Sequence, residues 1–247
     1  MTGGTDRVGP VGFFDSGFGG TCILAAFRRL CPGVKTLYIA DSANCPYGNK
    51  PAAEIIRLSE ANTEKLLAEG AQMIVVACNT ATAAAIDTLR AKYPDVPFVG
   101  LEPAIKPAAL RSKSGVVAVL ATQGTFDGRL YNETKAKFAK NVNVIATVAD
   151  EFVAAVEEVY RGLTVEEVLA RLADPGTFAA YEPLVRAKIE PLLAAGADHI
   201  VLGCTHFPHL KPLIERIAAG RAAVLDPSEA VARQAQRVLA SRGLLSD

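Results

Sequence analysis

The chain carries one sequence pattern twice, at residues 69–80 and 195–206. A Gly-Ala pair stands near the start of each copy, a short apolar run follows it, and a cysteine follows the run. Cys78 therefore corresponds to Cys204. Hydroxyl, amide or imidazole side chains follow each cysteine. A short apolar run of this kind is typical of a strand that is buried on both faces. The repeat therefore predicts two similar halves, each with a thiol just beyond the end of a buried strand.

The rest of the chain alternates short apolar runs with longer amphipathic ones, which is typical of parallel sheets with right-handed helical crossovers. We therefore expect an α/β fold with two similar parallel-sheet domains in pseudo-two-fold relation and an active-site cleft between them. Strands are expected at 9–14, 36–40, 73–77, 97–100, 115–120, 142–148, 199–203 and 222–225. Helices are expected at 19–31, 51–69, 79–92, 126–139, 151–160, 164–173, 179–194, 207–219 and 228–242.

The expected domain division follows from the repeat and from a run of prolines between residues 94 and 107. Residues 1–100 and 207–247 are assigned to the first domain, and residues 101–206 to the second. The segment 161–178 has no counterpart in the first half and is expected to be an insertion. Because ligands of parallel sheets bind at the carboxyl ends of strands, two facing halves would place both cysteines in one cleft.

Composition limits the class of protein. A chain of 247 residues, half of them hydrophobic, is long enough and apolar enough to form a real core. The balance of 26 basic and 26 acidic residues argues against a general nucleic-acid binder. No apolar run approaches the roughly 20 residues of a membrane span, and the first residues lack the apolar core of a signal peptide. We expect a soluble cytoplasmic protein with no nucleic-acid or membrane partner.

The five cysteines are odd in number and contain no CxxC pair, which argues against a disulfide framework and against a structural zinc site. No metal is expected. Cys22 and Cys31 fall in a helical pattern and are expected to be buried apolar residues. Cys45 lies in an expected loop and has no such explanation.

Cys78 and Cys204 are the principal catalytic candidates. A thiol has a reference pKa of about 8.5 and can give or take a proton near neutrality. Two such groups at equivalent strand ends suit a reaction that removes a proton from one face of a carbon and returns one to the other face. His206 is close enough in sequence to assist Cys204 as a proton relay. His199 is expected beside a strand, and His209 on a helix surface.

Three loops leave alternatives open. The glycine-rich segment 15–20 lacks the GxGxxG spacing of a dinucleotide site, so it is either a helix cap with a turn or a carboxylate that binds an ammonium group or tunes a thiol. The loop 41–48 is either an ordinary surface loop or a binding site for a carboxylate. Thr122 and Thr125 either cap a helix or donate hydroxyl groups to the cleft.

The segments 14–20, 46–48, 76–81, 101–103, 121–125 and 202–208, taken together and in this order, resemble the glutamate racemases of the aspartate/glutamate racemase superfamily. The resemblance spans nearly the whole chain. It implies cofactor-independent interconversion of L- and D-glutamate, which supplies D-glutamate for peptidoglycan, in a protein that is commonly a homodimer. It also implies that Cys204 acts on L-glutamate and Cys78 on D-glutamate, with Asp15 supporting Cys78 and His206 supporting Cys204.

The same resemblance implies the substrate pocket. The amino group would lie near Asp15 and Ser16, and the α-carboxylate near Asn79, Thr80 and Thr205. The rest of the pocket would be formed by Ser42, Pro46, Tyr47, Gly48, Thr122 and Thr125.

Two departures from the family pattern and two rival functions remain. Glu157 matches an auxiliary glutamate of the family best, but Glu151 competes with it. The loop 42–45 is unusual, so that Cys45, near the pocket, could alter regulation or redox sensitivity.

One rival function is a related enzyme acting on aspartate, a hydantoin or a malonate. The other is a non-catalytic module that only binds an amino acid.

Overall fold

The computed structural model describes residues 9–101, 104–172 and 174–245, so that part of the segment 101–103 lies outside the described residues. The strands are β1 (Val11–Asp15), β2 (Thr36–Ala40), β3 (Met73–Val76), β4 (Phe98–Val99), β5 (Val116–Ala121), β6 (Asn143–Val148), β7 (His199–Leu202) and β8 (Ala223–Leu225). The α-helices are α1 (Thr21–Leu30), α2 (Ala52–Ala68), α3 (Asn79–Lys92), α4 (Ile105–Arg111), α5 (Gln123–Phe126), α6 (Arg129–Phe138), α7 (Asp150–Val159), α8 (Val165–Arg171), α9 (Glu182–Ala194), α10 (Lys211–Ala218) and α11 (Ser228–Ser241).

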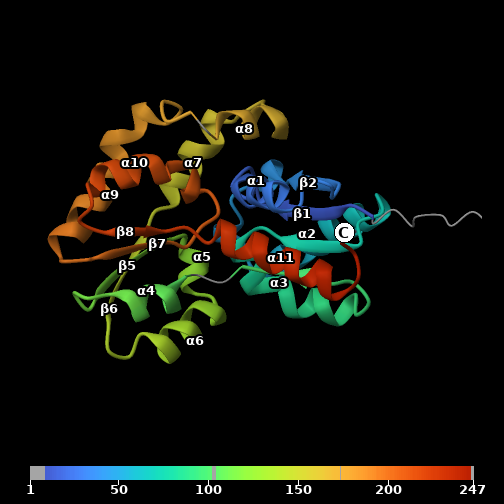
Figure 1. Ribbon diagram of the computed structural model, residues 1–247, viewed down its shortest axis with the longest axis horizontal. Coiled ribbons are helices and arrows are strands. Elements are labelled where there is room, and N and C mark those ends of the chain that lie inside the picture. Colours follow the sequence, from blue (N-terminus) through green and yellow to red (C-terminus); the bar gives the residue numbers. More distant parts are fainter. Residues whose placement is uncertain (1–8, 102–103, 173, 246–247) are drawn as a thin grey trace, which may run out of the picture.

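The strands form two four-stranded sheets with the same internal order. The first sheet runs β2-β1-β3-β4 and the second runs β6-β5-β7-β8. All neighbouring strands are parallel. Figure 1 shows the two sheets side by side, one in each lobe of the molecule. The second half therefore repeats the first strand by strand, which confirms the expected α/β fold class.

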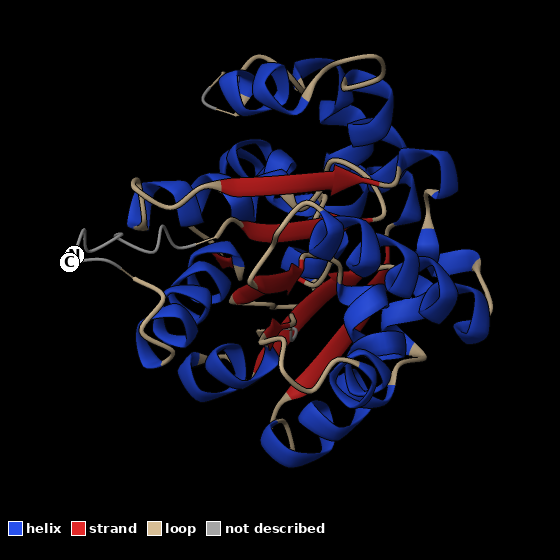
Figure 2. Cartoon of the chain, turned by 90° about the vertical axis from the view of Figure 1, so that its right-hand side faces the viewer, coloured by secondary structure: helices blue, strands red, loops and turns tan. Residues whose placement is uncertain are grey.

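Helices cover the sheets, so that the central strands are buried on both sides (Figure 2). Every residue of β1 and β3 is buried. A strand covered on both faces must be apolar along its whole length, which explains the unbroken apolar runs of the sequence. Among the described residues, no helix combines the length and the apolar character needed to cross a membrane.

The repeated Gly-Ala pair ends the helix that precedes each cysteine-bearing strand. Gly70 and Gly196 have φ angles of 85° and 84°, in the left-handed region that favours glycine. In both copies the N–H groups of the glycine and of the next alanine bond back to carbonyls in the last turn of the helix. This is the Schellman arrangement of a helix C-terminus. The sequence repeat therefore specifies the same local geometry twice, and it places Cys78 and Cys204 at equivalent positions.

The expected domain boundary at residue 207 is wrong. β8 pairs in parallel with β7, and α10 packs against α9, so residues 211–225 extend the second sheet and its helix layer. Helix α11 instead crosses to the first half, where it packs against α1. The physical reason is that β7 had a free edge with which β8 could pair. The order of elements along the chain does not show which of two sheets a later strand joins.

The segment 161–178 connects the two halves. Its helix α8 begins with a capping box between Thr164 and Glu167. Figure 1 shows α8 above α1, and these two helices are in contact. Val165 and Leu169 pack against the apolar core of the first half. Val168 and Phe178 belong to the core cluster of the second half, so the insertion packs against both halves.

Candidate active site

Cys78 and Cys204 line one narrow cavity of about 10 Å³ between the two halves. Cys78 follows β3 and caps α3, where its Sγ accepts a hydrogen bond of 3.4 Å from the Ala81 N–H. Cys204 stands at the same point after β7. The two residues are 4% and 7% exposed. The two cysteines therefore line one buried site, each supplied by a different half.

Most residues expected around the substrate line this cavity. Its walls consist of Ser16, Pro46, Tyr47, Gly48, Cys78, Asn79, Thr80, Thr122, Val153, Cys204, Thr205 and His206. Val153 of α7 was not expected, because an apolar side chain carries no chemical signal in the sequence. Four expected residues stand outside this lining, namely Asp15, Ser42, Thr125 and Glu157. Thr125 is nevertheless adjacent, since its hydroxyl lies 3.1 Å from that of Thr122.

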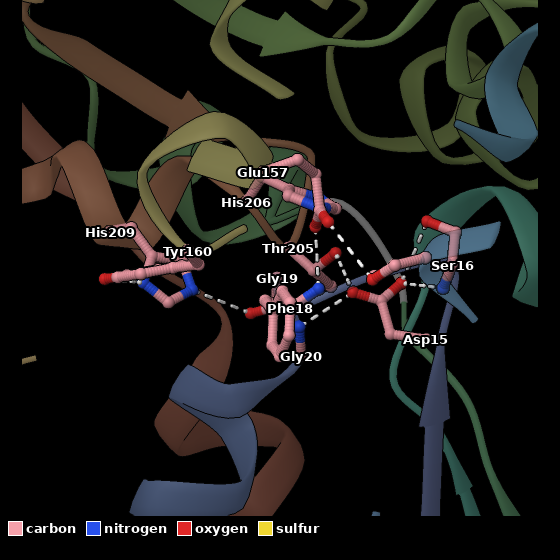
Figure 3. A network of polar contacts seen from close by, with 12 residues as sticks. Asp15, Ser16, Phe18, Gly19, Gly20, Glu157, Tyr160, Thr205, His206 and His209 are labelled. Atoms are coloured by element: carbon pink, nitrogen blue, oxygen red, sulfur yellow. Dashed lines mark hydrogen bonds and ion pairs between the residues drawn. The ribbon is translucent and has the colours of Figure 1, made fainter. Parts of the chain in front are cut away.

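The Asp15 carboxylate lies fully buried at the end of β1 (Figure 3). It accepts hydrogen bonds of 2.7 Å from the backbone N–H groups of Ser16 and Gly20, and one of 3.1 Å from the Thr205 hydroxyl. Burial raises the pKa of Asp15 despite these donors. Burial and the negative charge of Asp15 hold the pKa of the Cys78 thiol well above its usual value. Cys78 is therefore protonated at rest.

His206 and Glu157 form an ion pair (Figure 3). This pair lies beside Cys204. His206 Nε2 lies 2.7 Å from Glu157 Oε1, and its Nδ1 lies 3.7 Å from Cys204 Sγ. Burial lowers the pKa of His206, but hydrogen bonds to Cys204, Cys45 and Glu157 outweigh burial and raise this pKa well above its usual value. Burial alone would raise the pKa of Glu157. The hydrogen bond and the positive charge of His206 outweigh burial, so the pKa of Glu157 is lowered. An imidazolium therefore faces Cys204, whereas a carboxyl group faces Cys78.

Glu157 also links α7 to the first half. Its carboxylate accepts hydrogen bonds of 2.7 Å from the Phe18 N–H and 3.2 Å from the Ser42 hydroxyl. Glu151, the competing candidate, instead pairs with Lys188 at 2.8 Å. Of the two glutamates, Glu157 therefore lies at the site.

The glycines of the segment 15–20 permit this close approach between the halves. A Cβ at Gly17 would overlap the Glu157 carboxylate, and one at Gly19 would lie 2.5 Å from His206 Nδ1. These glycines are required because side chains of the second half press against the loop. The loop therefore does more than cap a helix, because its glycines leave space for the Glu157 carboxylate and the His206 imidazole of the other half.

Asn79 contributes free hydrogen-bonding groups to the cavity wall. Both polar atoms of its side-chain amide are buried and have no partner among the described residues. Buried polar groups are almost always hydrogen-bonded, so an unpartnered amide in a cavity wall indicates a polar ligand. Asn79 and Thr80 also start α3, where backbone N–H groups lack intrahelical partners and favour an anion. This wall suits a carboxylate.

His209 is buried, and its expected place on a helix surface is wrong. It lies in a 3-10 turn (Phe207–Leu210), with Nδ1 3.1 Å from the Tyr160 hydroxyl and Nε2 3.3 Å from the Gly19 carbonyl. Because a carbonyl only accepts, Nε2 carries the hydrogen and Nδ1 accepts from Tyr160. Burial lowers the pKa of His209 to about 3. His199, as expected, starts β7 and lies 2.8 Å from Asp198.

This fold and site define a class of α/β protein in which two repeated halves enclose a pair of buried thiols. The chain belongs to the Asp/Glu/Hydantoin racemase family, whose model matches residues 21–235.

The chain is similar to several glutamate racemases. That of Roseiflexus sp. (strain RS-1) is 44% identical over 236 residues, which cover 96% of this chain and 81% of the relative. The Escherichia coli glutamate racemase, solved with L-glutamate and the activator UDP-MurNAc-Ala, matches with a TM-score of 0.79 and 31% identity over 94% of this chain and 82% of that one. The Francisella tularensis enzyme, solved with D-glutamate, matches with a TM-score of 0.70 and 26% identity over 97% and 84%.

Proposed function

We propose that this chain interconverts L- and D-glutamate without a cofactor, using Cys78 and Cys204 as paired acid/base groups. The observation that carries the proposal is the pair of thiols at repeat-equivalent strand ends, lining one closed cavity. The related enzymes named above support glutamate as the substrate. The D-glutamate formed would supply peptidoglycan synthesis. The resemblance to these enzymes further supports a cytoplasmic homodimer.

The substrate is held by groups from both halves. The first-turn N–H groups of α3 and the Asn79 amide bind the α-carboxylate. Ser16, with the negative charge of Asp15 behind it, favours the ammonium group. Because these donors are fixed before the substrate arrives, they also stabilise the enediolate charge that develops when the α-proton leaves. The nearly closed cavity excludes water and strengthens these interactions.

Proton transfer then follows from the opposite charges beside the two thiols. Cys204, as a thiolate beside the His206 imidazolium, removes the α-proton of L-glutamate. Cys78, kept protonated by burial and by Asp15, delivers its proton to the opposite face. The product is D-glutamate, with the proton now on Cys204 and the negative charge on Cys78. The reverse reaction runs through the same groups in the opposite order.

Circular dichroism during incubation with either enantiomer tests the activity. L- or D-glutamate should lose optical activity without added cofactor, and in deuterated water the inverted product should carry deuterium at Cα. Cys78→Ser and Cys204→Ser should each abolish racemisation, whereas Cys22→Ser, on a cysteine outside the cavity, should preserve it. Undiminished racemisation in both active-site variants, or product that keeps its original α-hydrogen, would refute the two-thiol mechanism.

A one-way reaction separates the roles of the two thiols. Elimination from a glutamate analogue with a leaving group on Cβ needs only the base that removes the α-proton. Cys78→Ser should therefore still process the L analogue, and Cys204→Ser the D analogue. The opposite pattern would exchange the two assignments.

A substrate panel separates the rival functions. Racemisation of aspartate, or turnover of a hydantoin or a malonate, in preference to glutamate would identify a related enzyme. Binding of glutamate without loss of optical activity would identify a binding module.

A further inference from the structure

We propose that Cys45, Glu157 and His206 form a binding site for a thiophilic divalent cation such as Zn²⁺, and that the bound cation inhibits the enzyme. The inhibition rests on the proposed racemase function, whereas the binding does not.

The three side chains converge from separate elements. One ligand atom from each, a sulfur, a carboxylate oxygen and a ring nitrogen, lie within 4.8 Å of one another. In a tetrahedral zinc site with bonds of about 2.0–2.3 Å, ligand atoms are separated by roughly 3.3–3.8 Å. Small side-chain movements would therefore complete the geometry. Three protein ligands leave a fourth position for water, as in zinc sites that exchange their ligands.

A cavity of about 590 Å³ gives the cation a route to the site. Cys45 and Glu157 lie in its lining, and both are partly exposed. The same lining holds Asp150, Glu151 and Glu158, with Arg161 as its basic residue. A cleft with an excess of carboxylates concentrates cations near its walls. The site therefore has both an entrance and an attractive field.

Cys45 contacts His206 but neither gives nor takes a proton in the transfers proposed above. It does not line the cavity that holds the two catalytic thiols. Its loop is nevertheless held in place, because the Tyr47 hydroxyl and the Asn44 amide donate hydrogen bonds of 2.6 Å and 2.9 Å to Asp41. The thiol is thus held beside the His206–Glu157 pair, outside the cavity in which the proton transfers occur.

Cation binding would separate the groups that support Cys204. The Cys45 thiol and the His206 imidazolium each release one proton to solvent, and the thiolate, the freed His206 ring nitrogen and the Glu157 carboxylate bind the metal. No electron is transferred. The imidazole then carries the metal instead of a proton, so it no longer supports proton transfer at Cys204.

Cobalt substitution tests binding without any activity measurement. Co²⁺ added to the purified protein should produce a near-ultraviolet charge-transfer band, which reports a bond between thiolate and metal. Cys45→Ala should lose this band, and Cys22→Ala, which removes a partly exposed cysteine elsewhere, should keep it. Absence of the band in the wild-type protein, or an undiminished band in Cys45→Ala, would overturn the proposal.

Inhibition is tested with Zn²⁺ and a chelator. Cys45→Ala should retain racemase activity, and its half-inhibitory Zn²⁺ concentration, measured against its own activity without metal, should rise by about 100-fold or more. A chelator should restore wild-type activity. Equal inhibition of both proteins would overturn the regulatory role. If neither protein racemises glutamate while the cobalt band behaves as expected, the proposed function fails and the metal site stands.

Discussion

The Thr205 hydroxyl, which follows β7 in the second half, donates a hydrogen bond of 3.1 Å to the Asp15 carboxylate at the end of β1 in the first half. The two residues are 190 positions apart in the sequence. Both are buried, Asp15 completely. This bond joins the two halves beside the thiol cavity, and it fixes the position of a charge that controls Cys78.

Replacing Thr205 by valine should therefore weaken both stability and catalysis. The variant keeps the shape of the side chain but leaves a buried carboxylate oxygen with one donor fewer, at a cost of about 1–3 kcal/mol. Urea denaturation should show this loss, and the racemase assay should show a lower kcat. Thr205→Ser retains the hydroxyl and serves as the control. If the valine and serine variants behave alike, the hydrogen bond has no such role.

Gly17→Ala should lower activity by displacing Glu157. The added Cβ would occupy the place of the glutamate carboxylate, so the ion pair with His206 must shift. A displacement of about 1 Å at such a group can cost on the order of 100-fold in rate. Gly33→Ala is the matched control, because a Cβ there would meet nothing within 4 Å. Full activity in Gly17→Ala would show that Glu157 has freedom to move.

Much of the fold could be predicted from the sequence, because buried parallel strands are recorded directly as apolar runs. All eight expected strands are present, and α3 has its expected bounds. The expected helix at 126–139 corresponds to α6, whose N-cap is Gly128, and the separate short helix α5 before it was not expected. Helix α4 was missed, since Pro107 in its middle suggested a junction. Local patterns fail where a glycine or proline is accommodated by tertiary packing.

The site could be predicted only as far as chain-local chemistry and the repeat extend. The two thiols stand at repeated strand ends, so the sequence pairs them. The choice of Glu157 over Glu151 depends on contacts with Phe18 and Ser42, which are more than 100 residues away in the chain. The burial of His209 likewise depends on packing against Tyr160. Contacts between distant segments leave no periodic signal in the sequence.

Glu157→Gln should alter how stability depends on pH. The folded-state pKa of His206 is raised, so its contribution is complete below the unfolded value of about 6.5 and is lost as pH rises through the folded value. The folded-state pKa of Glu157 is lowered, so its contribution is present above about 4.3 and is lost as pH falls through the folded value.

The difference in melting temperature between the wild-type protein and Glu157→Gln should therefore be largest between about pH 4.3 and about pH 6.5. It should shrink on either side of that range. Thermal unfolding across a pH series measures it, and Glu151→Gln, on the glutamate paired with Lys188, is the control. A difference that does not change with pH would mean that the pair contributes through shape alone.

His209→Gln should flatten the acid side of the same stability curve. The folded protein holds His209 neutral down to about pH 3, because the imidazole is buried between Tyr160 and Gly19. The unfolded chain takes up a proton at this residue near pH 6.5. Between these values the unfolded state binds more protons, so wild-type stability falls as pH falls.

Glutamine at position 209 does not titrate, and its variant should lose less stability than the wild-type protein between about pH 7 and about pH 5. Urea denaturation at both pH values gives the comparison. Because the readout is the change with pH, a uniform loss of stability in the variant does not disturb it. Tyr160→Phe removes the hydroxyl partner but keeps the imidazole, so it should retain most of the wild-type slope. An unchanged slope in His209→Gln would show that the acid sensitivity arises at other groups.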